Sequence, residues 1–284
     1  MTSKILLLGS TGFLGRELKA ALAQAPCLLA PTKSELDVTD TAALHDYILR
    51  HQPATIINAV GLTGTQAASD HPELAQQLNS ELPQALAELA NQLEKCTLVH
   101  FSTLEVYGPV KPEHGQAYYT EDSPTRPKTV YAKTKLQGDL AVSSTATHYL
   151  IFRLSPLYDG ERLFAVEERE PIVIGAPTAV QYVANTVVRS LGRIERRVLR
   201  VHSGIYHLSS KGDADWQTFY REVTLQRQTP GLLGQATPTL VAVGPKLSVE
   251  KVENAFCLFV PSWQSQLKTF LRNREQVKES NQAL

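Results

Sequence analysis

Short apolar runs alternate with helical patterns along the first half of the chain, and this alternation limits the folds open to it. The runs are too short for buried helices, and they are apolar throughout rather than at every second residue. Strands have this character when helices cover both faces of their sheet, as in parallel sheets. The expected strands are residues 4–8, 27–30, 54–60, 96–102 and 149–155. The sequence therefore predicts an α/β fold with a doubly wound parallel sheet.

Helical patterns fill the segments between these strands. In the first half we expect helices at residues 13–24, 40–50, 71–94 and 129–143. The third should be interrupted near Pro83, because proline lacks the N–H that a helix interior needs. Thr39 or Asp40 can cap the second helix. In the less regular second half we expect strands at 171–174 and 205–208 and helices at 178–193, 215–226 and 262–272.

The charge and cysteine content exclude several classes of partner. Lys plus Arg and Asp plus Glu both number 28, so the formal net charge is zero. Nucleic-acid binders normally carry a basic excess, so no nucleic-acid partner is expected. No apolar run approaches the roughly 20 residues that span a membrane, so no membrane partner is expected. We therefore expect a cytoplasmic location. Cys27, Cys96 and Cys257 are scattered and odd in number, which indicates buried thiols in a reducing compartment.

A glycine-rich loop follows the first expected strand. Its sequence is Gly9-Ser10-Thr11-Gly12-Phe13-Leu14-Gly15. At a strand-to-helix turn, one glycine makes the tight turn, one lets a pyrophosphate approach the backbone, and one lets the helix pack closely. The helix N-terminus then offers free N–H groups to phosphate. This position predicts a dinucleotide site rather than a plain tight turn.

The glycine loop extends the prediction to domain organisation. We expect a Rossmann-type dinucleotide-binding core over residues 1–155, to which 178–210 return. Residues 156–177 and 211–284 should form a smaller C-terminal substrate lobe.

The end of the second expected strand bears on the choice of dinucleotide. An acidic residue there would bind the ribose 2′-hydroxyl of NAD. Here no acid occurs before Glu35, and Lys33 with its neighbouring hydroxyls favours the 2′-phosphate of NADP. An exposed Lys33 without that role is an equally good interpretation, so NAD stays open. Asp37 is then available to the adenine amino group.

Tyr131 and Lys135 form a Y-x-x-x-K pair on the helix expected at residues 129–143. Residues four apart share a helix face, so the two side chains can act together. A nearby ammonium lowers a tyrosine pKa towards working pH. Tyr131 could then protonate a carbonyl oxygen that accepts hydride, while Thr103, at the end of the fourth strand, holds that oxygen by a hydrogen bond.

Several segments together resemble a known superfamily. They include "GSTGFLG", "ELDVTD", "LNSELPQALA", "YAKTKLQGD", "FRLSPLYD", "GAPT" and "GIYHLSS". The chain resembles the extended short-chain dehydrogenase/reductases that act on sugar nucleotides, and in particular the dTDP-4-dehydrorhamnose reductases. The resemblance implies an NAD(P)H-dependent reductase of a keto group, on a nucleotide-linked 4-keto-6-deoxy sugar, with a homodimer through the helices at 71–94 and 129–143.

The resemblance also assigns roles to residues. It implies that Thr103, Tyr131 and Lys135 are catalytic and that Thr103, Glu105 and Tyr131 bind substrate. No metal is expected, because His71, His100, His114 and His207 show no metal-ligand spacing. With the residues argued above, the cofactor site comprises Gly9, Thr11, Gly12, Phe13, Leu14, Gly15, Lys33, Asp37, Val38, Asn58, Ala59, Val60, Asn79, Tyr131 and Lys135.

Leu104 and Glu105 separate this chain from related enzymes. Related 4,6-dehydratases carry Thr-Asp-Glu after the fourth strand, and Leu104 replaces the aspartate, so dehydration by that route is not expected. Glu105 keeps open an epimerase or a decarboxylase as an alternative. A second alternative is a non-catalytic NAD(P)-binding regulatory subunit, which a shorter segment between residues 160 and 175 favours.

Overall fold

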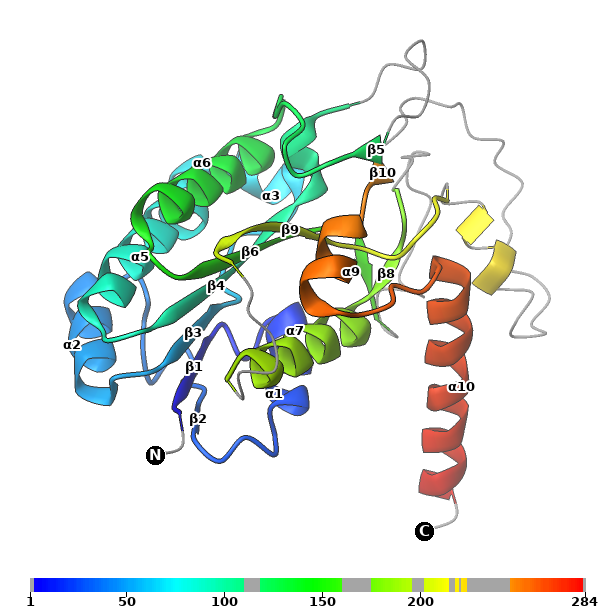
Figure 1. Ribbon diagram of the computed structural model, residues 1–284, viewed down its shortest axis with the longest axis horizontal. Helices are drawn as coiled ribbons and strands as arrows, with labels where there is room; N and C mark the ends of the chain where they lie inside the picture. Colours follow the sequence, from blue (N-terminus) through cyan, green and yellow to red (C-terminus); the bar gives the residue numbers. More distant parts are fainter. Residues whose placement is uncertain are drawn as a thin grey trace.

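A six-stranded parallel sheet forms the centre of the computed structural model (Figure 1). The structure describes residues 3–109, 118–159, 175–195, 202–214, 218–219, 221–223 and 246–282, with side chains as far as residue 273. The strand order is β2-β1-β3-β4-β6-β9. These strands are Ile5–Leu8 (β1), Leu28–Leu29 (β2), Thr55–Asn58 (β3), Thr97–Thr103 (β4), Tyr149–Leu154 (β6) and Gly204–Leu208 (β9). The predicted doubly wound α/β sheet is confirmed.

Helices cover both faces of this sheet (Figure 1). One face carries α2 (Thr41–His51), α3 (Thr65–Asp70), α4 (Pro72–Gln76), α5 (Leu82–Gln92) and α6 (Val130–Thr145). The other face carries α1 (Phe13–Ala21), α7 (Val180–Glu195) and α9 (Glu250–Phe256). The Asp40 side chain accepts a bond from Ala43 N and caps α2, as the sequence allowed.

Strand β1 shows why the expected strands are apolar throughout. Leu6 and Leu8 pack in the core under α2 and α5, whereas Leu7 packs in the core under α1 and α7. All three side chains are buried. Successive strand residues point to opposite faces, so a sheet covered on both sides needs apolar residues at every position.

A separate apolar cluster lies beside the sheet. It joins α10 (Trp263–Gln282) to the short parallel pair β7 (Leu157–Tyr158) and β8 (Thr178–Ala179). A second parallel pair, β5 (Tyr118–Tyr119) with β10 (Lys246–Leu247), lies next to the 3-10 turn η2 (Leu104–Tyr107). Both pairs bring together segments far apart in the sequence.

The helix expected at 71–94 is present but irregular. Between α4 and α5 the chain forms a π-helical turn, η1 (Gln77–Glu81). Pro83 follows it and has no N–H for the carbonyl oxygen of Asn79. That oxygen instead lies against Gly138 of α6, where an added Cβ would come within 2.1 Å of it. The interruption near Pro83 therefore serves close packing between α5 and α6.

Other segments differ from the expectations. Helix α9 and the four short strands β5, β7, β8 and β10 were not expected, because two-residue strands and a seven-residue helix leave no periodicity to detect. Only Cys96 is buried; Cys27 is half-buried and Cys257 is exposed, so the expectation of three buried thiols is confirmed at Cys96 alone. The expected strand at 171–174 lies outside the described residues, and the expected helix at 215–226 lies largely outside them.

Candidate active site

A cavity of about 450 Å³ opens at the carboxyl edge of the sheet. Loops that follow β1, β3, β4 and β6 surround it, because the carboxyl ends of parallel strands meet at one edge. Of the predicted site residues, this cavity collects Gly12, Phe13, Leu14, Asn58, Ala59, Val60, Asn79, Thr103, Glu105, Tyr131 and Lys135. An adjacent pocket of about 210 Å³ collects Gly9, Thr11, Lys33, Asp37 and Val38, and Val60 lines both.

The glycine loop brings the backbone of β1 and α1 into close contact. Gly9 has φ of +78°, and a Cβ there would lie 2.7 Å from the Ala59 carbonyl carbon. A Cβ at Gly15 would lie 1.9 Å from the oxygen of Gly9. Gly12 stands at the N-cap of α1, and no side chain caps that helix. The N-terminus of α1 is therefore open towards the cavity in the way an anionic group requires.

The adjacent pocket lies at the ends of β1 and β2. The side chain of Lys33 is exposed beside it. Asp37 Oδ1 accepts bonds from the backbone N–H of Thr39 at 3.0 Å and from its hydroxyl at 2.7 Å. These two donors lower the pKa of Asp37, so the carboxylate is charged at neutral pH. The pocket thus presents one cation and one anion beside the glycine loop.

Asn58 and Asn79 hold the loop after β3. Asn58 Oδ1 accepts a bond from Val60 N at 3.1 Å. The amide of Asn79 bonds both backbone groups of Leu62, at 2.9 and 3.0 Å. Because Asn79 is fully buried on the π-helical turn, we assign it to fixing this wall of the cavity.

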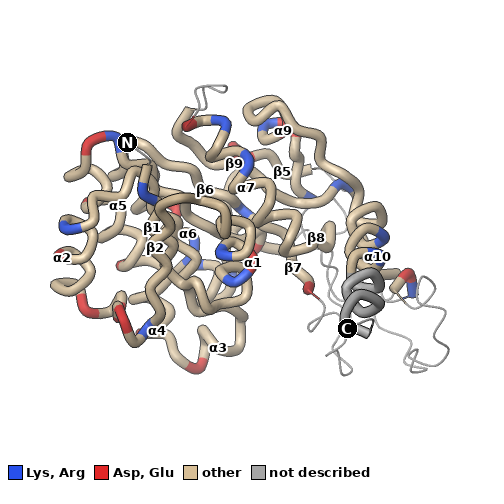
Figure 2. Tube along the Cα trace, turned by 90° about the horizontal axis from the view of Figure 1, so that it is seen from below, with Lys and Arg blue, Asp and Glu red and all other residues tan. Residues whose placement is uncertain are grey.

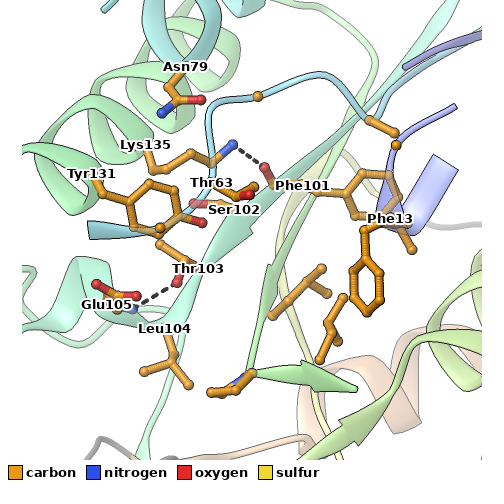
Figure 3. A pocket seen from close by; sticks show the side chains of 18 of the residues that line it. Phe13, Thr63, Asn79, Phe101, Ser102, Thr103, Leu104, Glu105, Tyr131 and Lys135 are labelled. Carbon is orange, nitrogen blue, oxygen red and sulfur yellow. Dashed lines mark hydrogen bonds between the residues drawn. The ribbon is translucent and has the colours of Figure 1, made fainter. Parts of the chain in front are cut away.

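Thr103 and Tyr131 meet at the centre of the cavity (Figure 3). Thr103 ends β4, and its Oγ1 accepts a bond from Glu105 N at 3.3 Å. Tyr131 stands in the first turn of α6, which the Thr129 side chain caps. The Tyr131 pKa is raised by burial and by the charge of Glu105, while the contact with Thr103 opposes this shift. Tyr131 is therefore protonated at neutral pH.

Lys135 lies one turn along α6 from Tyr131. Its Nζ donates a hydrogen bond to the backbone oxygen of Phe101 (Figure 3). Burial lowers the pKa of Lys135 to about 8, against the opposing charge of Asp139. The expectation that Lys135 brings the pKa of Tyr131 down towards working pH is not met in this structure, because burial and the charge of Glu105 raise that pKa and only Thr103 opposes them.

Glu105 and Leu104 occupy the turn after Thr103. The Glu105 pKa is raised by burial, and a contact with the Thr65 hydroxyl partly offsets the shift. The side chain of Leu104 packs with Val106 and Tyr107 and also lines the cavity. The turn therefore offers one carboxyl group to the cavity, and Leu104 adds an apolar surface that cannot transfer a proton.

Sequence reasoning missed part of the cavity wall. Thr63 and Gly64 in the loop after β3, and Ser155–Leu157 after β6, also line it. The Ser155 hydroxyl pairs with that of Thr178 at 2.7 Å, which ties this wall to β8. The position of these residues just past the carboxyl ends of expected strands was the signal that could have found them.

The described residues also bear on three other kinds of site: a charged surface patch, a metal centre and a membrane span. Figure 2 shows Lys and Arg interspersed with Asp and Glu around the molecule. Within the described ranges, no three His, Cys, Asp or Glu residues are grouped so as to hold a metal ion. Nor does any helix in the described part of the chain have the length and apolarity to cross a membrane.

Comparison with known families gives a match over nearly the whole chain. The family model described as the RmlD substrate binding domain matches residues 3–276. A protein of Shigella flexneri named dTDP-4-dehydrorhamnose reductase is 30% identical over 300 residues, covering 94% of this chain and 96% of its own length.

Solved structures share the fold. A dTDP-4-dehydrorhamnose reductase from Clostridium acetobutylicum superposes with a TM-score of 0.81 at 24% identity, covering 96% of this chain and 99% of its own. A protein of the same name from Bacillus anthracis, solved in complex with NADP, gives a TM-score of 0.78 at 23% identity with the same coverage.

Proposed function

The chain belongs to the RmlD substrate-binding domain family, and on this premise we propose that it is an NAD(P)H-dependent reductase. Its substrate is the keto group of a nucleotide-linked 4-keto-6-deoxy sugar. The proposal is supported by relatives named dTDP-4-dehydrorhamnose reductase over 94% of the chain. The observation that carries it is the meeting of a protonated Tyr131 with the Thr103 hydroxyl in the cavity beside the glycine loop.

The residues present fit a dinucleotide. A side chain at Gly9 or Gly15 would collide with backbone, so these glycines allow the tight turn and the close packing that place the N-terminus of α1 beside the cavity. Gly12, Phe13 and Leu14 would bind the pyrophosphate with the N-terminus of α1, and Thr11 and Val38 would enclose the adenosine. When bound, the nicotinamide supplies hydride, and the protein supplies orientation and electrostatics.

Three side chains would act on the carbonyl oxygen. The Thr103 hydroxyl accepts a bond from Glu105 N and contacts Tyr131, and in the complex it would donate its hydrogen to the carbonyl oxygen. Tyr131 gives its proton to the oxygen as negative charge develops there. The Lys135 ammonium offsets the charge of the resulting tyrosinate, so that the proton transfer costs less in the buried site.

The preferred cofactor in this proposal is NADPH, with NADH as the second choice. Lys33 is exposed beside the pocket at the end of β2, where a cation would attract a 2′-phosphate. The described residues of β2 and its following turn place no acid in the wall of that pocket before Asp37.

We also propose which parts of the chain bind the cofactor and the sugar, and how two chains associate. Residues 1–155 with 178–210 would bind the cofactor, and 156–177 with 211–284 would bind the sugar. The separate apolar cluster around Trp263 supports a second lobe. We propose a homodimer through the helices between residues 71 and 94 and α6, where Leu140 on α6 is 58% exposed.

The first experiment measures cofactor binding and turnover together. NADPH and NADH are titrated by protein fluorescence, and consumption is followed with a panel of nucleotide-linked 4-keto-6-deoxy sugars. We expect consumption, and we expect Tyr131→Phe to lower kcat by about 100- to 10,000-fold with unchanged cofactor binding. Tyr47→Phe on α2 serves as the control and should leave kcat unchanged. Tight cofactor binding without consumption of any sugar would instead favour the non-catalytic subunit.

A further inference from the structure

A fully buried ionic cluster lies behind Lys135. Asp139 follows Lys135 by one turn of α6, and its side chain is completely buried. Its Oδ2 accepts a bond from Arg153 Nε of β6 at 3.0 Å. Its Oδ1 lies 3.9 Å from Nε2 of His100 on β4, and neither atom has a hydrogen-bond partner among the described residues. Burying a carboxylate is costly, so its neighbours must stabilise the charge.

The neighbours of Asp139 are donors or cations. The amide nitrogen of Asn58 faces His100 Nδ1 at 3.4 Å, and its amide oxygen is already occupied by Val60 N. The amide nitrogen can only donate, so His100 Nδ1 accepts and the ring proton lies on Nε2, towards Asp139. Burial and Lys135 lower the pKa of His100, so the ring stays neutral. Burial raises the pKa of Asp139, while the ion pair with Arg153 and the charge of Lys135 oppose that shift, so these two cations are what favours its carboxylate.

The cluster holds more cations than carboxylates. Two cations act on one carboxylate, because Arg153 pairs with Asp139 at 3.0 Å and Lys135 stands one helical turn before it on α6. Other titratable groups face the cluster from η2, β9 and α6. Arg153 donates to the Tyr107 hydroxyl at 2.8 Å, which also pairs with His207, and Glu105 lies by Tyr131. The two tyrosine pKa values are raised by burial and that of His207 is lowered, so these three groups are neutral.

We propose that Asp139 is a positioning residue that keeps the ammonium of Lys135 charged beside Tyr131. Without its carboxylate, two cations would share one buried site with no anion between them. An arginine does not release its proton in proteins, so Lys135 would release its own. The catalytic consequence rests on the proposed function, because only a reductase needs the charge of Lys135 at Tyr131. The electrostatic coupling itself does not depend on it.

The test titrates Lys135 directly. The Nζ resonance of Lys135 is followed against pH in protein labelled with ¹⁵N-lysine, and is assigned by its absence in Lys135→Arg. We expect Asp139→Asn to lower the pKa of Lys135 by about one unit or more, and Asp139→Glu to restore most of it. Glu121→Gln is the matched control. It removes a carboxylate that bonds His207 N at the far end of the same polar network, and it should leave Lys135 unshifted.

The rate profile is the second readout. In the wild type kcat should fall as pH rises through the pKa of Lys135. In Asp139→Asn the alkaline fall of kcat should move to lower pH by as much as the pKa of Lys135 falls. At alkaline pH this lowers kcat about tenfold for each pH unit of the shift, while KM for the sugar stays unchanged. The proposal would be overturned if Asp139→Asn lost thermal stability while the pKa of Lys135 and the pH at which kcat falls stayed unchanged.

NMR titration distinguishes failure of the proposed function from failure of the coupling between Asp139 and Lys135. It also gives an answer if the variant does not fold. If no sugar is reduced but Lys135 shifts in Asp139→Asn, the proposed function fails and the coupling stands. If Asp139→Asn does not fold, the ¹³C carboxyl resonance of Asp139 in the wild type decides. Ionisation throughout the range from pH 6 to 9 supports the proposal, and a protonated carboxyl at pH 7 contradicts it.

Discussion

Glu105 places a carboxyl group beside Tyr131. Whether this carboxyl group is needed for activity distinguishes a reductase from an epimerase or a decarboxylase. Burial raises its pKa, which makes its carboxylate a stronger base and keeps more of the group protonated near neutral pH. A reductase needs neither property, because Tyr131 already supplies the proton. An epimerase or a decarboxylase would need a base at this place, and Leu104 cannot serve as one.

Glu105→Gln is therefore expected to reduce kcat for the keto sugar by no more than about tenfold. Glutamine keeps the size and removes the charge that raises the pKa of Tyr131. The measurement is steady-state turnover with NADPH, alongside exchange of substrate C–H with deuterated water. A loss of several orders of magnitude, together with exchange in the wild type only, would identify Glu105 as a base and favour the acid–base alternative.

Lys33 is the residue on which the choice of cofactor depends. We expect Lys33→Ala to weaken NADPH binding about fivefold and NADH binding little, because a single exposed cation beside a 2′-phosphate contributes about 1 kcal/mol. Dissociation constants from fluorescence titration at low and high salt test this. Lys95→Ala, an exposed lysine far along the chain, is the control. Equal weakening of both cofactors would mean that Lys33 does not read the 2′-phosphate.

At the scale of elements, the sequence predicted what periodicity and glycine chemistry encode. The five apolar runs became β1, β2, β3, β4 and β6, because parallel strands buried on both faces leave a continuous signal. The glycine loop and the Tyr131–Lys135 helix lie where the sequence placed them. The pair β5 and β10 could not be expected, since two-residue strands are defined only by a distant partner. The wall at Ser155 depends in the same way on Thr178.

The contact between α6 and the π-helical turn gives a prediction at this scale. In Gly138→Ala the new Cβ would lie 2.1 Å from the Asn79 oxygen, a backbone atom that cannot rotate away. We expect the free energy of unfolding to fall by about 1–3 kcal/mol, although alanine favours helices over glycine. Urea denaturation measures it, with exposed Gln137→Ala as the control. Greater stability in Gly138→Ala would show that the helices can separate at no cost.

At the scale of the whole molecule, buried neutral histidines make the free energy of unfolding depend on pH. His207 bonds the Tyr107 hydroxyl and the Ser248 oxygen, and burial lowers its pKa to about 3. Below the unfolded value of 6.5 the unfolded chain takes up a proton that the folded chain refuses. The contribution of His207 to stability is therefore complete above pH 6.5 and is lost as the pH falls towards 3.

Between pH 7 and pH 5 we expect His207 alone to cost the folded state about 2 kcal/mol. His207→Gln should be less stable at pH 7 but should lose less stability on acidification than the wild type. Thermal or urea unfolding across this range measures the difference. The exposed His45→Gln variant should retain the slope of the wild type. Identical slopes in His207→Gln and the wild type would mean that His207 is already charged in the folded protein.

The pairing of β6 with β9 has a consequence while the chain is being made. Tyr149 N bonds Ser203 Oγ, a residue 54 positions later, and β9 follows directly. At roughly 5–20 residues per second, a ribosome needs on the order of 3–10 seconds to deliver β9 after β6. During that interval the nascent chain exposes an apolar strand edge to any other strand it meets. A transcript truncated before residue 204 would leave that edge open permanently, and its product would aggregate rather than persist as a cofactor-binding fragment.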